Sequence, residues 1–385
     1  MKNTLISCLM LHSVGVPFSQ WNWRFLTLPW QNFEGMLRWL CRMGYRGVTF
    51  EEYHQICRKD RLKKERAVCL TFDDGYLDNW VYASVLLEKY KFCGTVFVSG
   101  DFINPGLECR PRWNGDAKGP FPDASGFLNV AELRQLDASG VLDVQAHAMT
   151  HTWYPCGPRI VDFRHPGDTY HWMDWNAAPQ EKWRYLQPPE NPAVWGEPVY
   201  EHHKAMQGPI FFPNPIVAET LRGFFSSREK DYFLKPDWRN ELFQLAENLQ
   251  KKHPAGHWEE QDAYLTRVES ELTGSARILE SVLSKKVSYL CWPGGGYSPE
   301  AFAMAARYYA GTTIGSADRT RVQGEDDSGC YRFHRIGPLN VEHRGEIRYL
   351  CPLTNALYIE ERRTRNGLCR LVRGGLTRLG QWGIQ

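Results

Sequence analysis

Short apolar runs alternate with segments of helical periodicity in the first 150 residues of the chain and again after about residue 265. Phe33, Met36, Leu37 and Leu40, for example, fall on one face of a predicted helix that Gly44 closes. Strands that alternate with helices favour a parallel sheet in an α/β fold.

The alternation predicts a definite series of elements. In chain order they are a strand within residues 1–12, a helix over 30–43, a strand over 48–50, a helix over 51–59, a strand over 67–72, a helix over 79–91, a strand over 94–98, a helix ending at 138, a strand over 141–147, a helix over 266–283, a strand over 287–291, a helix over 299–309 and a last strand over 331–338. Asn129 with Glu132 forms a capping box, and Ser298 with Pro299 starts a helix.

One predicted strand, residues 67–72, ends on two adjacent carboxylates, Asp73 and Asp74, followed by Gly75. Neighbouring side chains on a strand point to opposite faces, so the two carboxylates can address one centre only if the strand ends there and Gly75 lets the backbone turn. Such a pair suggests a metal ligand beside an acid/base group. The alternative is an ordinary Asp-Asp-Gly turn.

A second apolar strand, residues 141–146, leads into His147 and His151. Their spacing of four places both imidazoles on one side of a helical turn or tight loop. A histidine pair at this spacing can be incidental. Combined with a strand-end carboxylate, it gives a three-ligand set with open positions, which is typical of catalytic zinc.

These stretches resemble the motifs of the polysaccharide deacetylase family, carbohydrate esterase family four. Thr71–Tyr76 matches the first motif, and His147–His151 matches the second with Ala148 where serine or threonine is common. Tyr289–Pro299 resembles the third motif, although Gly294 replaces the aromatic residue that usually follows the proline. The resemblance covers residues 1 to about 150 and about 265 to 340.

The resemblance implies an irregular (β/α) barrel, which we expect to have seven strands with its motifs at the carboxyl ends of the strands. We therefore expect a discontinuous barrel of residues 1–151 and 265–345, an aromatic and proline-rich insertion at 152–264, and a basic tail at 346–385.

The resemblance also implies roles for individual residues. Asp74, His147 and His151 would hold a divalent metal, with Zn²⁺ expected and Co²⁺ or Ni²⁺ as alternatives, and Asp73 would be the catalytic base. Backbone N–H groups in the Pro293–Gly294 turn, that of Gly294 in particular, would bind the oxyanion, with Tyr76 of the first motif at the substrate site.

Two features of the family pattern are missing. No arginine precedes Pro293 to orient the base, and no Leu-x-His general-acid motif is evident. In the last predicted strand, His334 is a candidate general acid and Arg335 a candidate for orienting Asp73, unless the two are an ordinary edge-strand pair. His12 follows the first strand and is either near the site or a structural histidine.

The inserted segment, residues 152–264, is too long to be an unstructured loop within a compact domain. Because it begins directly after His151, we expect an ordered cap near the metal. Its aromatic side chains could stack on sugar rings or form the cap's own small core. Its histidines, His165, His171, His202 and His203, are not expected to be ligands.

Composition and charge bear on the partners of the protein and on its location in the cell. Net charge is +2 over 385 residues, so no global field argues for nucleic-acid binding. Eleven scattered cysteines without a Cys-x-x-Cys pattern indicate reduced thiols in a cytosolic protein. The N-terminal apolar stretch is short and lacks a convincing cleavage site, so we interpret it as a barrel strand rather than a signal peptide, and no apolar run approaches the ~20 residues of a membrane span.

Residues 361–385 combine six arginines with one acidic residue and apolar positions at helical spacing. This basic amphipathic face could lie on an anionic membrane surface, pack on the barrel or be disordered, and its glycines weaken a helix.

The sequence thus predicts a cytoplasmic metal-dependent hydrolase that removes an acyl group, N-acetyl by preference, from a saccharide. Peripheral contact with the inner face of the membrane is a further hypothesis. The expected substrate is a glycan precursor, nucleotide sugar or lipid-linked sugar. The alternatives are a metal-independent hydrolase of small cyclic amides and a catalytically inactive carbohydrate-binding protein.

Overall fold

A computed structural model of the protein describes residues 6–18, 21, 23–58, 65–184, 192–225, 230–315, 324–325, 328–343 and 346–382. Up to the inserted segment the elements are β1 (Ser7–Leu11), β2 (Ser13–Gly15), η1 (Arg24–Leu26), β3 (Thr27–Pro29), α1 (Trp30–Arg42), β4 (Arg46–Val48), α2 (Phe50–Arg58), β5 (Ala67–Phe72), the π-helix η3 (Asn79–Ala83), α3 (Ser84–Tyr90), β6 (Gly94–Val98), η4 (Gly100–Phe102), α4 (Val130–Ala138) and β7 (Leu142–Ala146).

The inserted segment contains β8 (Trp153–Phe163), α5 (His171–Ala177), η5 (Pro179–Arg184), η6 (Pro192–Val194), β9 (Pro198–Lys204), β10 (Phe211–Pro213), α6 (Pro215–Phe225), η7 (Lys230–Leu234), α7 (Trp238–Lys252) and β11 (Gly256–Trp258). The chain continues with α8 (Gln261–Leu283), β12 (Tyr289–Leu290), η8 (Pro293–Gly295), α9 (Pro299–Ala305), β13 (Gly311–Thr313), β14 (Gly324–Glu325), β15 (Tyr331–Phe333), β16 (Asn340–His343), β17 (Glu346–Tyr349), α10 (Pro352–Thr364) and α11 (Gly367–Trp382).

The main sheet has the order β1-β5-β6-β7-β12-β13-β15-β14, with β4 also paired to β5. Every pairing from β1 to β15 is parallel. The sheet curls until Leu9 and Ile336 form a parallel bridge, in which the Met10 amide donates to the Ile336 carbonyl at 2.8 Å. The predicted mixed α/β fold with a barrel-like sheet is therefore confirmed, whereas the count of seven strands and the status of the inserted segment stay predictions.

Alternation along β5 explains how the sheet positions its terminal residues. Val68, Leu70 and Phe72 pack in the outer core with the surrounding helices, whereas Cys69 packs in a separate cluster on the other face. That inner cluster includes Phe50 and Phe333, whose ring centroids lie 4.2 Å apart, and it fills the space enclosed by the curled sheet. Asp73 continues the series of inward-facing positions of β5.

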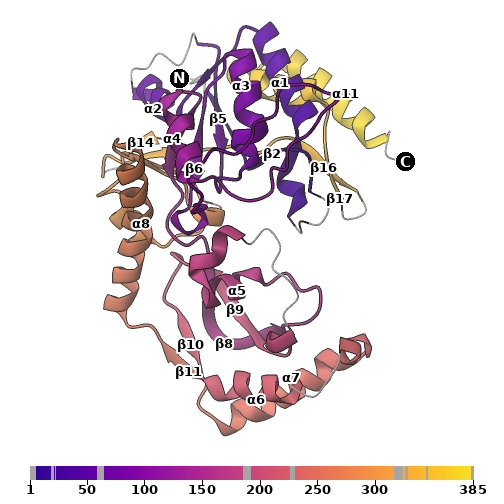
Figure 1. Cartoon of the computed structure of the whole chain (residues 1–385), viewed down its shortest axis with the longest axis vertical. Helices are drawn as coiled ribbons and strands as arrows, with labels where there is room; N and C mark the ends of the chain where they lie inside the picture. Colours follow the sequence, from indigo (N-terminus) through magenta and orange to yellow (C-terminus); the bar gives the residue numbers. More distant parts are fainter. Residues whose placement is uncertain are drawn as a thin grey trace.

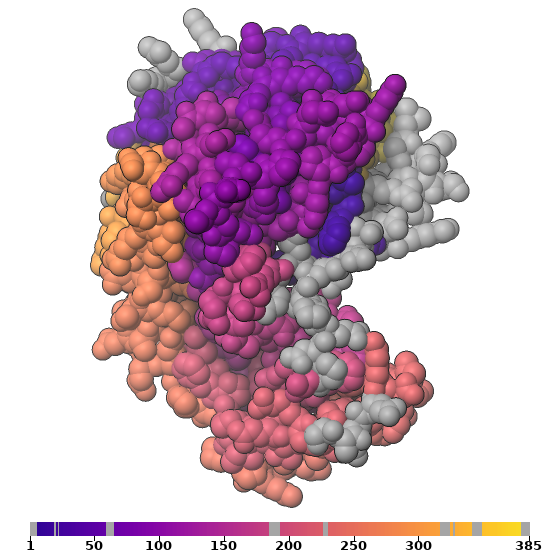
Figure 2. All heavy atoms as spheres, viewed as in Figure 1, coloured from indigo at the N-terminus to yellow at the C-terminus, as the bar shows by residue number. Residues whose placement is uncertain are grey.

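The inserted segment folds into an ordered body beside the barrel (Figure 1). The strands β8 and β9 pair antiparallel. Helices α6 and α7 cover its own apolar cluster, which contains Phe163, Phe225 and Trp238 among others. Packing is thus the role that the structure gives to many of its aromatic side chains. In the space-filling view the surface is hollowed between the barrel and residues 211–258 (Figure 2).

A second aromatic cluster joins the inserted segment to the barrel. Trp172 and Trp175 of α5 pack there with Tyr76 and with Phe102 and Phe127. The inserted segment is therefore fixed against the end of β5 that carries Asp73 and Asp74.

The predicted elements were largely correct, with differences at their ends. Helix α1 and the Asn129–Glu132 capping box are confirmed, as is the start of α9 at Ser298. The predicted strand over 48–50 exists but lies two residues earlier, because β4 covers Arg46–Val48 and Phe50 already begins α2. Residues 79–83 form a π-helix before α3; all five are buried, so no amphipathic spacing distinguishes this wider turn from an α-helix.

Other predicted boundaries shifted as well. Helix α8 begins at Gln261 rather than 266, α9 ends at Ala305, and β12 covers only two residues. The last strand ends at Phe333, although the bridge at Ile336 continues its course. Residues 1–5 and Lys59 of the predicted elements lie outside the described residues.

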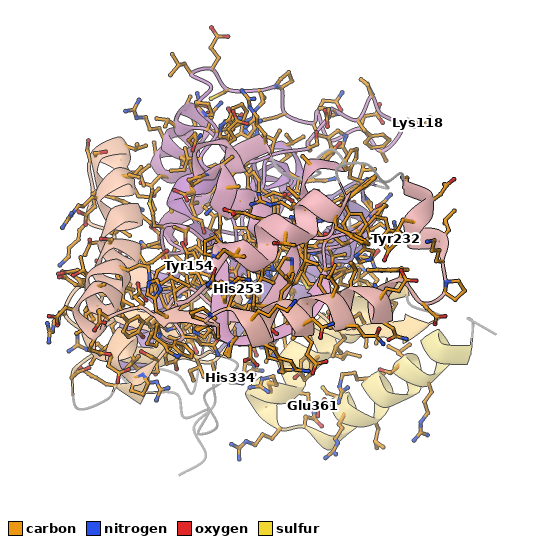
Figure 3. The ribbon with its side chains drawn as sticks, turned by 90° about the horizontal axis from the view of Figure 1, so that it is seen from below. Lys118, Tyr154, Tyr232, His253, His334 and Glu361 are labelled. Atoms are coloured by element: carbon orange, nitrogen blue, oxygen red, sulfur yellow. The ribbon has the colours of Figure 1, made fainter. Side chains whose placement is uncertain are left out.

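Residues after β17 fold onto the barrel. Helix α10 packs against α1, where Gly35 leaves room for the ring of Pro352 and the Asn32 amide donates to the Leu350 carbonyl at 3.2 Å. Helix α11 follows, and an ion pair of 2.7 Å joins its Arg373 to Glu361 of α10. Figure 3 labels Glu361. A helix is therefore confirmed in this basic stretch despite its glycines.

Candidate active site

The backbone turns sharply at the two carboxylates that end β5. The Asp73 amide still donates to the Leu11 carbonyl at 2.9 Å, so the sheet ladder reaches this residue. Asp74 then takes a φ of 73°, and Gly75 a φ of 78°. Few residues other than glycine adopt this left-handed conformation, and it costs of order 1–3 kcal/mol for a side chain such as that of Asp74. The turn aims both carboxylates at one region, as the sequence required.

His147 and His151 lie on a tight loop after β7. Ala148 and His151 both have positive φ, at 55° and 46°, which keeps the two rings on one side of the loop. The His147 Nδ1 lies 2.8 Å from the Cys291 carbonyl and directs Nε2 toward Asp74. The Nε2 atoms of both histidines lie 3.1 Å from Asp74 Oδ1.

These three residues fit a bound metal ion. In tetrahedral zinc sites ligand atoms about 2.1 Å from the ion lie roughly 3.4 Å apart, close to the separations found here. Among the described residues Asp74 Oδ1 is buried without a hydrogen-bond partner, which an ion would supply. The alternative group of Asp73, His147 and Cys291 is less suitable, because Asp73 is already paired with an arginine.

The charges around Asp74 favour its ionised, ligating form. Burial raises the pKa of Asp74, but the imidazoles of His151 and His147 outweigh it and hold this pKa well below its ordinary value. Burial also lowers the pKa of His151, whereas Cys291 and Asp74 overcome burial and raise that of His147. Ligating imidazoles are neutral, so a proton and a metal ion compete for these two histidines.

Asp73 is held by Arg335. The guanidinium donates to both carboxylate oxygens, at 2.6 and 2.8 Å, and also to the Thr71 hydroxyl at 3.1 Å. Burial raises the pKa of Asp73, but Arg335 overcomes this effect and lowers the pKa. His12 Nε2 lies 4.0 Å from Asp73 Oδ2. Asp73 is therefore an oriented, ionised carboxylate beside the three metal-binding candidates.

One cavity of about 440 Å³ brings most of the predicted residues together. Its lining includes Asp73, Asp74, His147, His151, His12, His334, Arg335 and Gly294. Gly294 has a φ of 54° in the turn η8. Pro293, the first residue of this turn, is buried and is not among the residues that line the cavity. Tyr76 is buried in the aromatic cluster instead and faces a neighbouring cavity.

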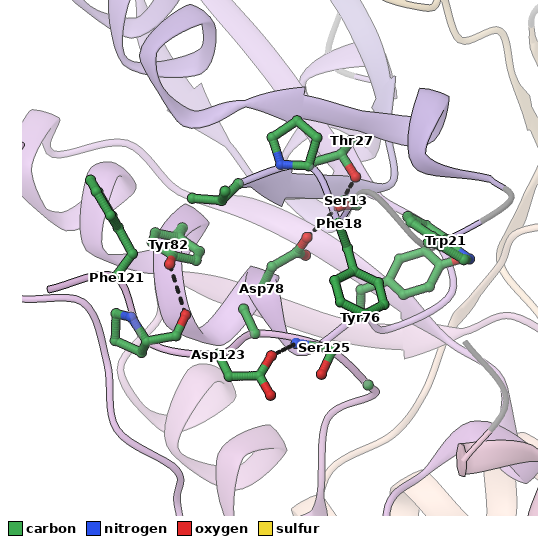
Figure 4. Close-up of a pocket in the computed structure, with 15 residues that line it drawn as sticks. Ser13, Phe18, Trp21, Thr27, Tyr76, Asp78, Tyr82, Phe121, Asp123 and Ser125 are labelled. Atoms are coloured by element: carbon green, nitrogen blue, oxygen red, sulfur yellow. Dashed lines mark hydrogen bonds between the residues drawn. The ribbon is translucent and has the colours of Figure 1, made fainter. Parts of the chain in front are cut away.

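That neighbouring cavity, of about 250 Å³, is less suited to catalysis (Figure 4). Its polar groups already bind one another: the Asp78 carboxylate accepts from Ser13, the Tyr82 hydroxyl donates to the Pro122 carbonyl at 2.9 Å, and Asp123 accepts from the Ser125 amide at 2.9 Å. The larger cavity, with its unpaired Asp74 oxygen, is the candidate active site.

Sequence reasoning missed three residues around this site. Glu271 of α8 accepts hydrogen bonds from the amides of Met149 and Thr150, at 3.2 and 2.9 Å, and so fixes the histidine loop. The signal was a charged residue, Glu271, among the buried positions of α8. Cys291 Sγ contacts Arg335 at 2.9 Å, and Lys204 of the inserted segment reaches Gly294. No local pattern marks either residue.

Comparison with known proteins agrees with the site. Residues 60–187 match the family model described as polysaccharide deacetylase, so this part of the chain carries the sequence pattern of that family. The family consists of hydrolases that act on carbon–nitrogen bonds.

The chain is 34% identical over 102 residues to YxkH of Bacillus subtilis (strain 168), which is named as a polysaccharide deacetylase. It is 21% identical over 130 residues to the poly-beta-1,6-N-acetyl-D-glucosamine N-deacetylase of Escherichia coli (strain K12). These alignments cover 26% and 34% of this chain, but only 34% and 18% of the two relatives.

Among solved structures, a de-N-acetylase from Aggregatibacter actinomycetemcomitans has a TM-score of 0.49 at 15% identity, with 86% of this chain and 94% of that chain covered. The BpsB deacetylase domain from Bordetella bronchiseptica also has a TM-score of 0.49, at 14% identity, with 87% and 97% covered.

Proposed function

We propose that the protein is a metal-dependent hydrolase that removes an acyl group, N-acetyl in the first instance, from a saccharide. The observation that carries this proposal is the pair of imidazole Nε2 atoms 3.1 Å from Asp74 Oδ1, with the Arg335-bound carboxylate of Asp73 in the same cavity. Zn²⁺ suits this donor set, and Co²⁺ or Ni²⁺ are alternatives.

A divalent ion held by Asp74, His147 and His151 would lower the pKa of a bound water toward ~7 and polarise the acyl oxygen. Asp73, kept ionised and oriented by Arg335, accepts a proton from the attacking water. The water oxygen bonds to the acyl carbon, and the carbon–nitrogen bond breaks. His334, at the same cavity, gives a proton to the leaving amine, so that acetate and a free amine result.

The features that suggested an inactive protein carry less weight once the fold is known. Although no arginine precedes Pro293, Arg335 contacts both oxygens of Asp73 from another strand. The unpaired Asp74 oxygen likewise favours a metal-dependent reaction over metal-independent cyclic amide hydrolysis.

For the substrate, we propose an acetylated glycan precursor in the cytoplasm, either a nucleotide sugar or a lipid-linked sugar used in polysaccharide biosynthesis. All eleven cysteines are free in the structure, which suits a reducing compartment. Cell fractionation with an antibody to the protein tests the location.

We further propose that α11 contacts an anionic membrane surface. Leu368, Leu371 and Val372 share one face of this helix and are exposed, and Arg370 lies beside them. No helix in the described part of the chain is long and apolar enough to cross a bilayer, so the contact would be peripheral.

The test of the enzymatic proposal is acetate release. The purified protein is stripped with a chelator, reloaded with Zn²⁺, Co²⁺ or Ni²⁺, and incubated with a panel of N-acetylated and O-acetylated saccharides. Acetate release that returns with metal supports the proposal. Equal release by the stripped protein would favour the cyclic amide type of mechanism, and saccharide binding without release would favour an inactive binding protein.

A further inference from the structure

Lys204, the last residue of β9, reaches from the inserted segment into the neighbourhood of the metal-binding candidates. It pairs across the β8–β9 ladder with Trp153, and its ammonium lies 3.6 Å from the centroid of the Trp153 ring. The Trp153 ring centroid lies 5.8 Å from that of His151. The short link from His151 to β8 thus determines where the ammonium lies.

The side chain of Lys204 occupies space that two glycines leave free. A Cβ at Gly294 would lie 2.3 Å from the Lys204 Nζ, and a Cβ at Gly296 would lie 2.4 Å from its Cγ. The ammonium therefore lies against the backbone of Gly294. A side chain at position 294 would displace the ammonium, so this placement of Lys204 requires glycine there.

The charge of Lys204 is not neutralised by any carboxylate in the described part of the chain. Lys182, also buried in the inserted segment, is instead paired with Asp101 at 3.0 Å and donates to the Thr150 carbonyl at 2.8 Å. Burial lowers the pKa of Lys204 to about 8, against the attraction of Asp74. Lys204 is partly buried, and its ammonium contacts the face of Trp153, so desolvation of the charge is costly unless a ligand uses it.

We propose that Lys204 donates a hydrogen bond to the acyl oxygen of the substrate, beside the N–H of Gly294, and stabilises the negative charge that develops there. Donors positioned at a developing oxyanion contribute about 10²–10³-fold to kcat. This role rests on the proposed function, and it makes the inserted segment a part of the catalytic site.

The test uses Lys204→Met, which keeps most of the side-chain volume but removes the charge, and Lys251→Met, an exposed lysine of the same segment, as the matched control. Two readouts are needed on zinc-loaded protein: acetate affinity by calorimetry, and hydrolysis of p-nitrophenyl acetate. We expect Lys204→Met to bind acetate at least tenfold more weakly and to lose about 10²-fold in kcat with little change in KM. Zinc affinity should stay as in the wild type, and Tm should not fall, because the variant no longer desolvates a charge.

Gly294→Ala gives an independent check, because its Cβ would displace the Lys204 ammonium. It should weaken acetate binding when introduced into the wild type. If Lys204→Met binds acetate and turns over as the wild type does, Lys204 does not stabilise the acyl oxygen, and the proposed function remains intact. Failure of the wild type itself to bind zinc would instead overturn the proposed function. Weaker acetate binding together with wild-type hydrolysis of p-nitrophenyl acetate in Lys204→Met would show that Lys204 binds an anion rather than the acyl oxygen, and this outcome too would overturn the proposal.

Discussion

Arg335 binds both carboxylate oxygens of Asp73, although 262 residues separate the two along the chain. The curled sheet makes this contact, because Ile336, next to Arg335, pairs with β1, which lies beside β5. The arginine that is missing before Pro293 thus has a spatial counterpart at the end of β15. Bidentate pairing fixes the direction of the Asp73 carboxylate as well as its charge.

Arg335→Gln should reduce kcat by roughly 10²-fold, an amount typical of losing an oriented acid/base group, without loss of bound metal. Burial alone raises the pKa of Asp73, so the acid limb of the pH profile should move to higher pH. The pH dependence of kcat/KM checks both points. Arg335→Lys keeps the charge but not the bidentate pairing, so its kcat should lie between that of the wild type and that of Arg335→Gln. An unchanged pH profile in Arg335→Gln would contradict the proposed role of Arg335 in orienting Asp73.

Glu271→Ala should lower zinc affinity by about 10–100-fold, because the amides of Met149 and Thr150 then lose the carboxylate that fixes the histidine loop. Calorimetric zinc titration measures the change. Glu271→Gln keeps one acceptor oxygen and should lose less. Zinc affinity equal to that of the wild type in both variants would show that the loop needs no such support.

Asp78 makes stability depend on pH. Burial raises its pKa from 3.8 to about 6, against the hydrogen bonds from Ser13 and Asn79. Between these values the folded protein keeps a proton that the unfolded chain has lost, so stability falls as pH rises through this window. The difference between these two pKa values of Asp78 corresponds to about 3 kcal/mol in the free energy of unfolding.

Asp78→Asn removes this titration, so the stability of the variant relative to the wild type should increase from pH 4 to pH 6 and then level off. Urea unfolding at several pH values measures the difference. Asp123→Asn, at an exposed carboxylate of the same cavity, is the control and should not show this rise. A pH-independent difference for Asp78→Asn would contradict the account.

Replacing Leu368 and Leu371 of α11 with aspartate should reduce binding to phosphatidylserine vesicles at least tenfold, since the change removes apolar area and adds repulsion. Vesicle sedimentation measures the partition, with phosphatidylcholine vesicles as the control. Truncation after Asn366 is a second variant that keeps α10 on the barrel. Equal binding by all three proteins would eliminate the membrane contact.

How much the sequence revealed depends on how local each feature is. Asp73 and Asp74 ended an apolar strand, and His147 and His151 followed another, so local pattern sufficed to nominate the four residues. Their convergence required only parallel strands that end at one edge.

The contact of Lys204 with Gly294 required the path of the inserted segment, which no periodicity encodes. The contact of Arg335 with Asp73 required closure of the sheet. Helix boundaries such as that between η3 and α3 were missed because fully buried residues carry no amphipathic pattern.

The central claim is that Asp74, His147 and His151 hold a metal ion while Asp73 acts beside it. Zinc titration of the metal-free wild type, Asp73→Asn and Asp74→Asn, followed by acetate release from each zinc-incubated protein, tests it most directly. The account predicts that Asp73→Asn binds zinc as the wild type does but loses nearly all turnover, and that Asp74→Asn loses both. Equal loss of zinc in the two variants, or no zinc bound by the wild type, would contradict it.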